Sequence, residues 1–109
     1  MHARETDLPM GTEPEGFRST KAEWGGCRAT FERASAGFDT SPYFADQPDG
    51  SCPVEHWGYL IKGRMLVRYG DHEETVSEGE AYHLAPGHNV IALDDIQMVE
   101  FTPRQKFGG

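Results

Sequence analysis

The sequence predicts an all-β domain built as a sandwich or barrel of short antiparallel strands. Turn signals recur about every eight to twelve residues, which is typical of such folds, and the chain contains 13 Gly and 7 Pro. No segment keeps a helical periodicity of hydrophobic residues for more than about eleven residues. A chain of 109 residues that is 37% hydrophobic and 11% aromatic is expected to form one domain with one modest core.

Composition also excludes several classes of partner. The formal net charge of −8 argues against nucleic acid and anionic membrane surfaces, because both require basic patches. No run approaches the roughly 18 apolar residues of a membrane span, and the first residues lack the apolar segment of a signal peptide. We therefore expect a cytoplasmic protein in which Cys27 and Cys52 are reduced.

The first part of the chain contains fewer strands than the second. Residues 1–15 are polar and are expected to form a flexible arm. A short strand is predicted at 16–20 and another at 27–33, where Cys27, Ala29 and Phe31 alternate with polar residues. This alternation predicts that Cys27 is a small, buried core residue. The apolar island at 42–45 predicts an edge strand.

The second part alternates between strands and turns. The barrel is expected to span residues 16–103, with a polar tail at 104–109. Glycine, proline and aspartate separate the segments and provide the turns. The predicted strands are 57–61, 64–69, 73–76, 81–84, 88–93 and 96–101.

Three residues form a candidate metal site. Cys52 and His56 are four positions apart, and an even spacing on extended backbone keeps two side chains on one face. His88 follows a Pro-Gly turn at the start of a strand. A thiolate and two imidazoles suit zinc first, and also iron, nickel or copper. Three protein ligands leave one position for water or substrate. The alternative is that these are ordinary packed or hydrogen-bonded side chains.

Four further residues are candidates for the pocket or for a supporting role. Glu55 neighbours His56 and is expected to point away, but an irregular strand would let it replace Cys52 as a ligand. Tyr43 is a candidate for an aromatic pocket wall. Tyr82 or its neighbour faces inward. Glu100 is a candidate acceptor for the N–H of a ligating imidazole.

The stretch from Tyr43 to Pro103 resembles a small single-domain bacterial cupin. The first cupin motif has the form G-x5-H-x-H-x3,4-E-x6-G. Anchored on Gly63, this motif places Cys52 at its second His and His56 at its Glu, whereas Gly50 replaces its first His.

The second cupin motif has the form G-x5-P-x-G-x2-H-x3-N. Anchored on Gly79, it matches Gly87 and places Val90 at its His. His88 lies two residues before that position and, by strand alternation, faces the same way. The framework glycines therefore match the family, whereas the ligand set departs from it.

The resemblance implies a cupin-type double-stranded β-helix, also called a jelly-roll barrel. It implies a mononuclear divalent transition-metal centre, with Cys52, His56 and His88 as ligands, that acts on a small organic molecule by isomerase, lyase or dioxygenase chemistry. Because the ligand set is altered, a cupin module that binds metal or a small molecule without turnover is the alternative. Cupins often pair through their sheets, so a homodimer is expected.

Overall fold

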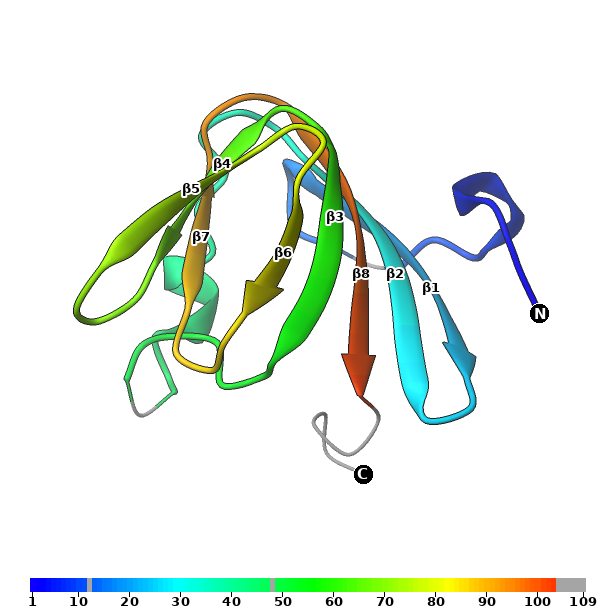
Figure 1. The fold of residues 1–109 in the computed structure, drawn as a ribbon, viewed down its shortest axis with the longest axis horizontal. Coiled ribbons are helices and arrows are strands. Elements are labelled where there is room, and N and C mark those ends of the chain that lie inside the picture. Colours follow the sequence, from blue (N-terminus) through cyan, green and yellow to red (C-terminus); the bar gives the residue numbers. More distant parts are fainter. Residues whose placement is uncertain (12, 48, 104–109) are drawn as a thin grey trace.

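Two antiparallel sheets form the body of the protein in the computed structural model, which describes residues 1–11, 13–47 and 49–103. Two short 3-10 helices, η1 (Glu5–Asp7) and η2 (Ser41–Phe44), lie outside the sheets (Figure 1). The strands are β1 (Phe17–Trp24), β2 (Cys27–Ala34), β3 (His56–Lys62), β4 (Arg64–Arg68), β5 (Glu73–Ser77), β6 (Ala81–Leu84), β7 (Asn89–Ala92) and β8 (Ile96–Pro103).

The strand order is not the chain order. The larger sheet runs β1-β2-β8-β3-β6 and the smaller runs β5-β4-β7, so the chain crosses repeatedly from one sheet to the other. Figure 1 shows the strands of the smaller sheet to the left of those of the larger one. The predicted all-β jelly-roll class is confirmed. Because the two sheets face each other, the side chains on their inner faces form the core and any internal site.

The core lies between the sheets, from the turn that joins β3 to β4 to the start of β3, where Leu84 lies opposite His56. Leu60, Met65, Val67 and Leu84 are almost completely buried there. The alternation predicted for β4 holds, since Met65 and Val67 point inward. At the turn, Gly63 has a positive φ of 82°, and a Cβ atom there would collide with the carbonyl oxygen of Asp95. Only glycine fits this turn without strain.

Two predicted segments differ from the structure. Residues 42–45 are not an edge strand, because η2 occupies most of them. Pro42 at the first turn favours this helix, since its fixed φ suits a helical start and its missing N–H is not needed there. The first strand also runs further than predicted, to Trp24, because β1 pairs with β2 along its full length.

The orientation of β2 is opposite to the one predicted. Cys27 is half-buried rather than a core residue, and the face that it shares with Phe31 points away from the second sheet. The opposite face, with Glu32 and Ala34, lines the interior cavity. The alternation was identified correctly, but on this strand the face with Phe31 lies outside and the face with Glu32 lies inside.

The chain before β1 contacts the larger sheet at several points. The carboxylate of Glu5 accepts two hydrogen bonds from the Arg33 guanidinium, at 2.7 and 2.9 Å. Met10 forms an isolated antiparallel bridge with Thr20 of β1. The predicted tail at 104–109 lies outside the described residues. Within the described ranges, no helix is long and apolar enough to cross a membrane.

Candidate metal centre

The backbone brings Cys52 and His88 together directly. The two residues form an isolated antiparallel bridge, in which the Cys52 N–H donates to the His88 carbonyl at 2.8 Å and the Gly87 N–H donates to the Cys52 carbonyl at 2.8 Å. Gly87 has a φ of 96°, which favours glycine at this turn. His56 enters from the first position of β3. Thirty-five residues of sequence therefore separate Cys52 from His88, which share this short bridge.

The potential ligand atoms of Cys52, His56 and His88 all lie within 4.8 Å of one another. The Cys52 Sγ is 3.8 Å from the His56 Nε2, and the two imidazole rings meet edge to face with centroids 5.4 Å apart. Ligands of one tetrahedral zinc lie roughly 3.3–3.6 Å apart, given the usual Zn–S and Zn–N bond lengths. The three groups can thus hold one metal ion after small adjustments.

Each imidazole is oriented by a hydrogen bond at its other nitrogen. The His88 Nδ1–H donates to the Ala85 carbonyl at 2.7 Å, which leaves the Nε2 lone pair of the neutral ring free. The His56 Nδ1 lies 2.7 Å from the Thr102 Oγ1. With Nδ1 as donor, the His56 Nε2 presents its lone pair toward Cys52. This is the usual arrangement of metal-binding histidines, in which a second partner fixes ring orientation and tautomer.

Burial keeps these three groups uncharged. Burial, followed by the neighbouring His88, lowers the pKa of His56 to about 4. Burial also lowers the pKa of His88 and raises the pKa of the Cys52 thiol. The imidazoles are therefore neutral at pH 7 and need lose no proton to bind a metal, whereas the thiol must lose one.

Glu55 and Glu100 occupy positions different from those expected for ligands or their supports. Glu55 binds the exposed His83, whose Nε2 lies 2.7 Å from the Glu55 Oε2, and is not part of the three-residue group. The Glu100 Oε1 lies 3.9 Å from the His56 Nδ1, which is too long for a hydrogen bond. Thr102 takes that role instead. No sequence pattern singled out Thr102.

The two candidate tyrosines lie in different environments. Tyr43 is 57% exposed and stacks on Phe38 outside the interior cavity. Tyr82 is buried, and its hydroxyl donates to the Glu100 Oε2 at 2.6 Å. Burial and the adjacent Glu100 raise the pKa of Tyr82, so its hydroxyl keeps its proton.

An interior cavity of about 220 Å³ is lined by the candidate metal ligands and by one residue that the sequence did not single out. Cys52, His56, His88 and Glu100 line it, and so does Glu32 on β2. Glu32 is half-buried as a residue, with its carboxyl group hydrogen-bonded to Glu100. Burial, and then Glu100, raises the pKa of Glu32 well above its ordinary value. The only available signal was the position of Glu32 on an alternating strand whose polar face was wrongly assigned to solvent.

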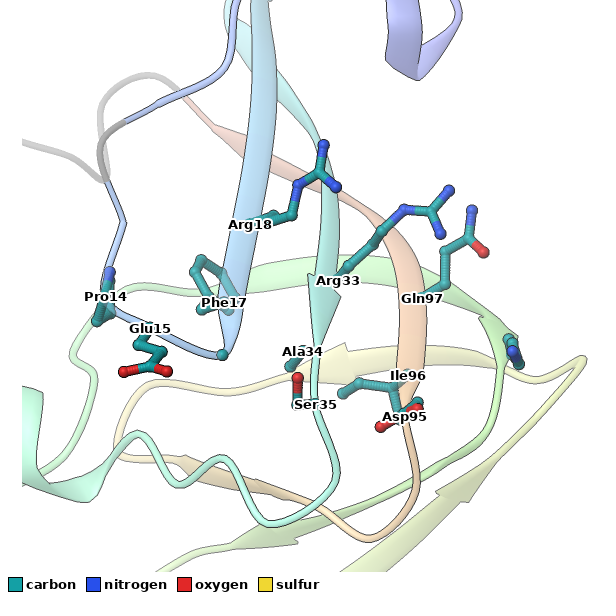
Figure 2. Close-up of a pocket in the computed structure, with 12 residues that line it drawn as sticks. Pro14, Glu15, Phe17, Arg18, Arg33, Ala34, Ser35, Asp95, Ile96 and Gln97 are labelled. Carbon is teal, nitrogen blue, oxygen red and sulfur yellow. The ribbon is translucent and has the colours of Figure 1, made fainter.

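A larger and more open hollow of about 530 Å³ lies at the other end of the larger sheet. Figure 2 shows the Arg18 and Arg33 side chains projecting side by side over it, with Gln97 next to them. These three residues are cross-strand neighbours on β1, β2 and β8. Arg33, one of the lining residues, also binds Glu5 of η1 and so ties the N-terminal segment to the larger sheet.

Comparison with solved structures identifies the fold. An RmlC-like cupin from Shewanella frigidimarina superposes with a TM-score of 0.69 over 94% of this chain and 88% of its own, at 8% identity. Oxalate decarboxylase OxdC from Bacillus subtilis matches at 0.72 and 15% identity, covering 96% of this chain and 30% of its own. KdgF from Halomonas sp. matches at 0.64 and 16% identity, covering 93% of each chain.

These identities are low, so the likeness concerns the fold. No protein-family model matches the chain, and no curated protein matches its sequence. The RmlC-like cupin and KdgF superpose along most of their own length, whereas the chain corresponds to about a third of the decarboxylase. The structure shares the jelly-roll fold of the RmlC-like cupin, which is the fold that the resemblance implied.

Proposed function

Because the chain folds as a small cupin barrel, we propose that it is a metal-binding cupin with one divalent transition-metal ion held by Cys52, His56 and His88. The observation that carries this proposal is the convergence of one thiol and two neutral imidazoles within 4.8 Å at the wall of a cavity. One thiolate and two imidazoles favour zinc, while iron, nickel and copper also accept this set. A small organic molecule would occupy the adjoining cavity.

A bound metal would supply Lewis-acid or redox chemistry to a molecule in that cavity. We propose isomerase, lyase or dioxygenase chemistry, with the protein residues binding and orienting the reacting molecule. The chemistry named for one neighbour, oxalate decarboxylation, does not fit this cavity well. Two carboxyl groups line it, and no lysine or arginine is among its described lining residues, so only the metal itself would balance the charge of a dianion.

Metal content tests the proposal directly. Protein purified without a chelator or a His-tag is expected to contain close to one metal ion per chain by elemental analysis. Cys52→Ala and His88→Ala should each lose most of it, because two remaining ligands hold a metal weakly. Cys27→Ala and His83→Ala are matched controls, since both residues lie outside the group. Wild-type protein with far less than one metal, and no difference among the four variants, would contradict the proposal.

The second candidate is a cupin that binds metal and ligand without turnover. The thiol in the ligand set favours it, because a thiolate donates charge and weakens the metal as a Lewis acid. An uncharged diketone offered to the metal-loaded protein separates the two functions. Conversion to product supports the enzyme, whereas saturable binding without product supports the binding module.

A further inference from the structure

The interior cavity is polar at one end and apolar at the other. On the inner face of β8, Thr102 and Glu100 lie beside His56. Met98 and Ile96 are the next inward-facing residues toward the start of the strand, and both line the cavity. The inner face of this strand therefore changes from polar beside the candidate metal ligands to apolar away from them.

The strands around the cavity repeat this change in the same direction. On β2, Glu32 precedes Ala34, which lies opposite Ile96. On the smaller sheet, Ala92 of β7 comes four positions after His88, and all five of these residues line the cavity. Four residues of extended chain span about 13 Å. The cavity is therefore elongated along the strands, with the candidate ligands at one end and Ala34, Ala92 and Ile96 at the other.

Aromatic rings close the apolar end. Phe17 of β1 lies opposite Ala34, and its ring stacks on that of Phe38 with centroids 5.3 Å apart. Apart from the three candidate ligands, the two glutamates and Thr40, every described lining residue is hydrophobic. Water is held poorly by such a wall, so an apolar group that enters this end gains the free energy of burial.

The cavity of about 220 Å³ is larger than the roughly 150 Å³ that holds the six carbons of benzene in an apolar protein interior. We propose that it takes a small molecule with an oxygen-bearing head group at Cys52, His56 and His88 and an unbranched apolar tail of about four to six carbons that extends toward Ala34 and Ile96. This rests on the function proposed above, because it names the class of molecule that the same site takes.

Straight-chain hydroxamic acids test this class, because they share one metal-binding head group and differ only in the tail. Zinc-loaded protein is titrated by calorimetry with acids of roughly two, four, six and ten carbons. Each methylene added up to the six-carbon acid should tighten binding about fourfold, the value of burying one such group. The ten-carbon acid should bind no more tightly than the six-carbon acid. Equal affinity for the two-carbon and six-carbon acids overturns the proposal, and so does a gain that continues unchanged to the ten-carbon acid.

Ala34→Leu shows where the tail lies, because the larger side chain fills the apolar end of the cavity. The affinity for the six-carbon acid should fall about tenfold or more, and that for the two-carbon acid should change by less than about threefold. Ala81→Leu is the matched control, since Ala81 is an exposed residue of β6 outside the lining set. An equal effect of Ala34→Leu on both acids, or none, overturns the proposal. If this variant does not fold, Ala92→Val fills the same end with fewer atoms, and an unchanged ratio of the two affinities in that variant has the same consequence.

Failure of the metal function gives a different result. Zinc uptake is measured first by calorimetry on the wild-type protein, and no uptake refutes the metal centre. The same acids are then titrated into metal-free protein, with the backbone amide shifts of Val90 and Ile96 followed by NMR. Tighter binding of longer tails there supports the apolar end and rejects the head-group position, whereas no dependence on tail length rejects both. Normal zinc uptake without any dependence on tail length refutes the ligand class alone.

Discussion

Thr102 orients the His56 ring toward the proposed metal. It acts through that ring and is not one of the three candidate ligands. Its hydroxyl lies 2.7 Å from the His56 Nδ1. Thr102→Val keeps the shape and removes this partner. We expect zinc affinity to fall about tenfold, the lower end of the usual effect of losing such a partner, as measured by competition with a zinc chelator. Thr75→Val, at an exposed position of β5, should bind zinc as the wild type does. Equal affinity of both variants would show that the Thr102 contact does not orient the ligand.

The depressed pKa of His56 makes stability depend on pH. Its folded pKa is about 4 against an ordinary 6.5, because burial and His88 oppose the charged ring. Between these values the unfolded chain binds a proton that the folded chain does not. The free energy of unfolding of metal-free protein should therefore fall as pH drops from 6.5 toward 4.

His56→Asn isolates this contribution. The raised pKa of Glu32 acts in the opposite direction, since its folded form holds a proton longer than the unfolded form does. That contribution is present in both proteins and largely cancels in the comparison. Urea unfolding at several pH values should show a shallower loss of stability toward acid in the variant. Parallel curves for both proteins would argue that His56 is not desolvated.

At the scale of the strand, the sequence predicted positions along the chain better than the side that each strand turns inward. All eight described strands overlap a segment that alternation and turn signals predicted as a strand. The placement of Cys52 and His56 on one face followed from their spacing alone. The face of β2 did not follow, because the outside of the larger sheet is as apolar as its inside. Glu32 was missed for that reason. Thr102 was missed because its role depends on the register of β3 against β8, which no local pattern encodes.

Gly58 of β3 is required by the packing of the strand beside it. It lies opposite Tyr82 of β6, and a Cβ atom there would approach the Tyr82 ring and the Val99 carbonyl more closely than real contacts allow. Gly58→Ala should destabilise the fold by about 1–3 kcal/mol through overpacking, as measured by urea unfolding.

Gly26→Ala is the matched control for that measurement. Gly26 lies in the β1–β2 turn without a positive φ, and a Cβ atom there would meet nothing within 4 Å. The free energy of unfolding of this variant should lie within about 0.5 kcal/mol of that of the wild type. An equally mild effect of Gly58→Ala would show that Tyr82 can move away, and with it the hydrogen bond that Tyr82 donates to Glu100.

At the scale of the whole molecule, the outer face of the larger sheet is the surface best suited to association. Trp57 lies opposite Phe101, and Tyr59 opposite Val99, so these side chains form one continuous apolar patch. Trp57, Tyr59 and Phe101 are 43–45% exposed, a level at which large aromatic side chains seldom gather without a partner. The patch contains no acidic residue, which matters in a chain with a net charge of −8.

We propose that a second copy of the chain covers this patch. Two identical acidic molecules repel each other least where both lack carboxylates, and a flat apolar sheet face can be complementary to itself about a twofold axis. Sedimentation at micromolar concentration should give twice the 12.2 kDa chain mass. Trp57→Asp should shift the protein to monomer by burying a charge in each half of the interface. Leu93→Asp, at an exposed leucine outside the patch, should leave the dimer intact. A wild-type protein that sediments as a monomer, or a Trp57→Asp variant that stays dimeric, would show that the two copies do not meet on this face.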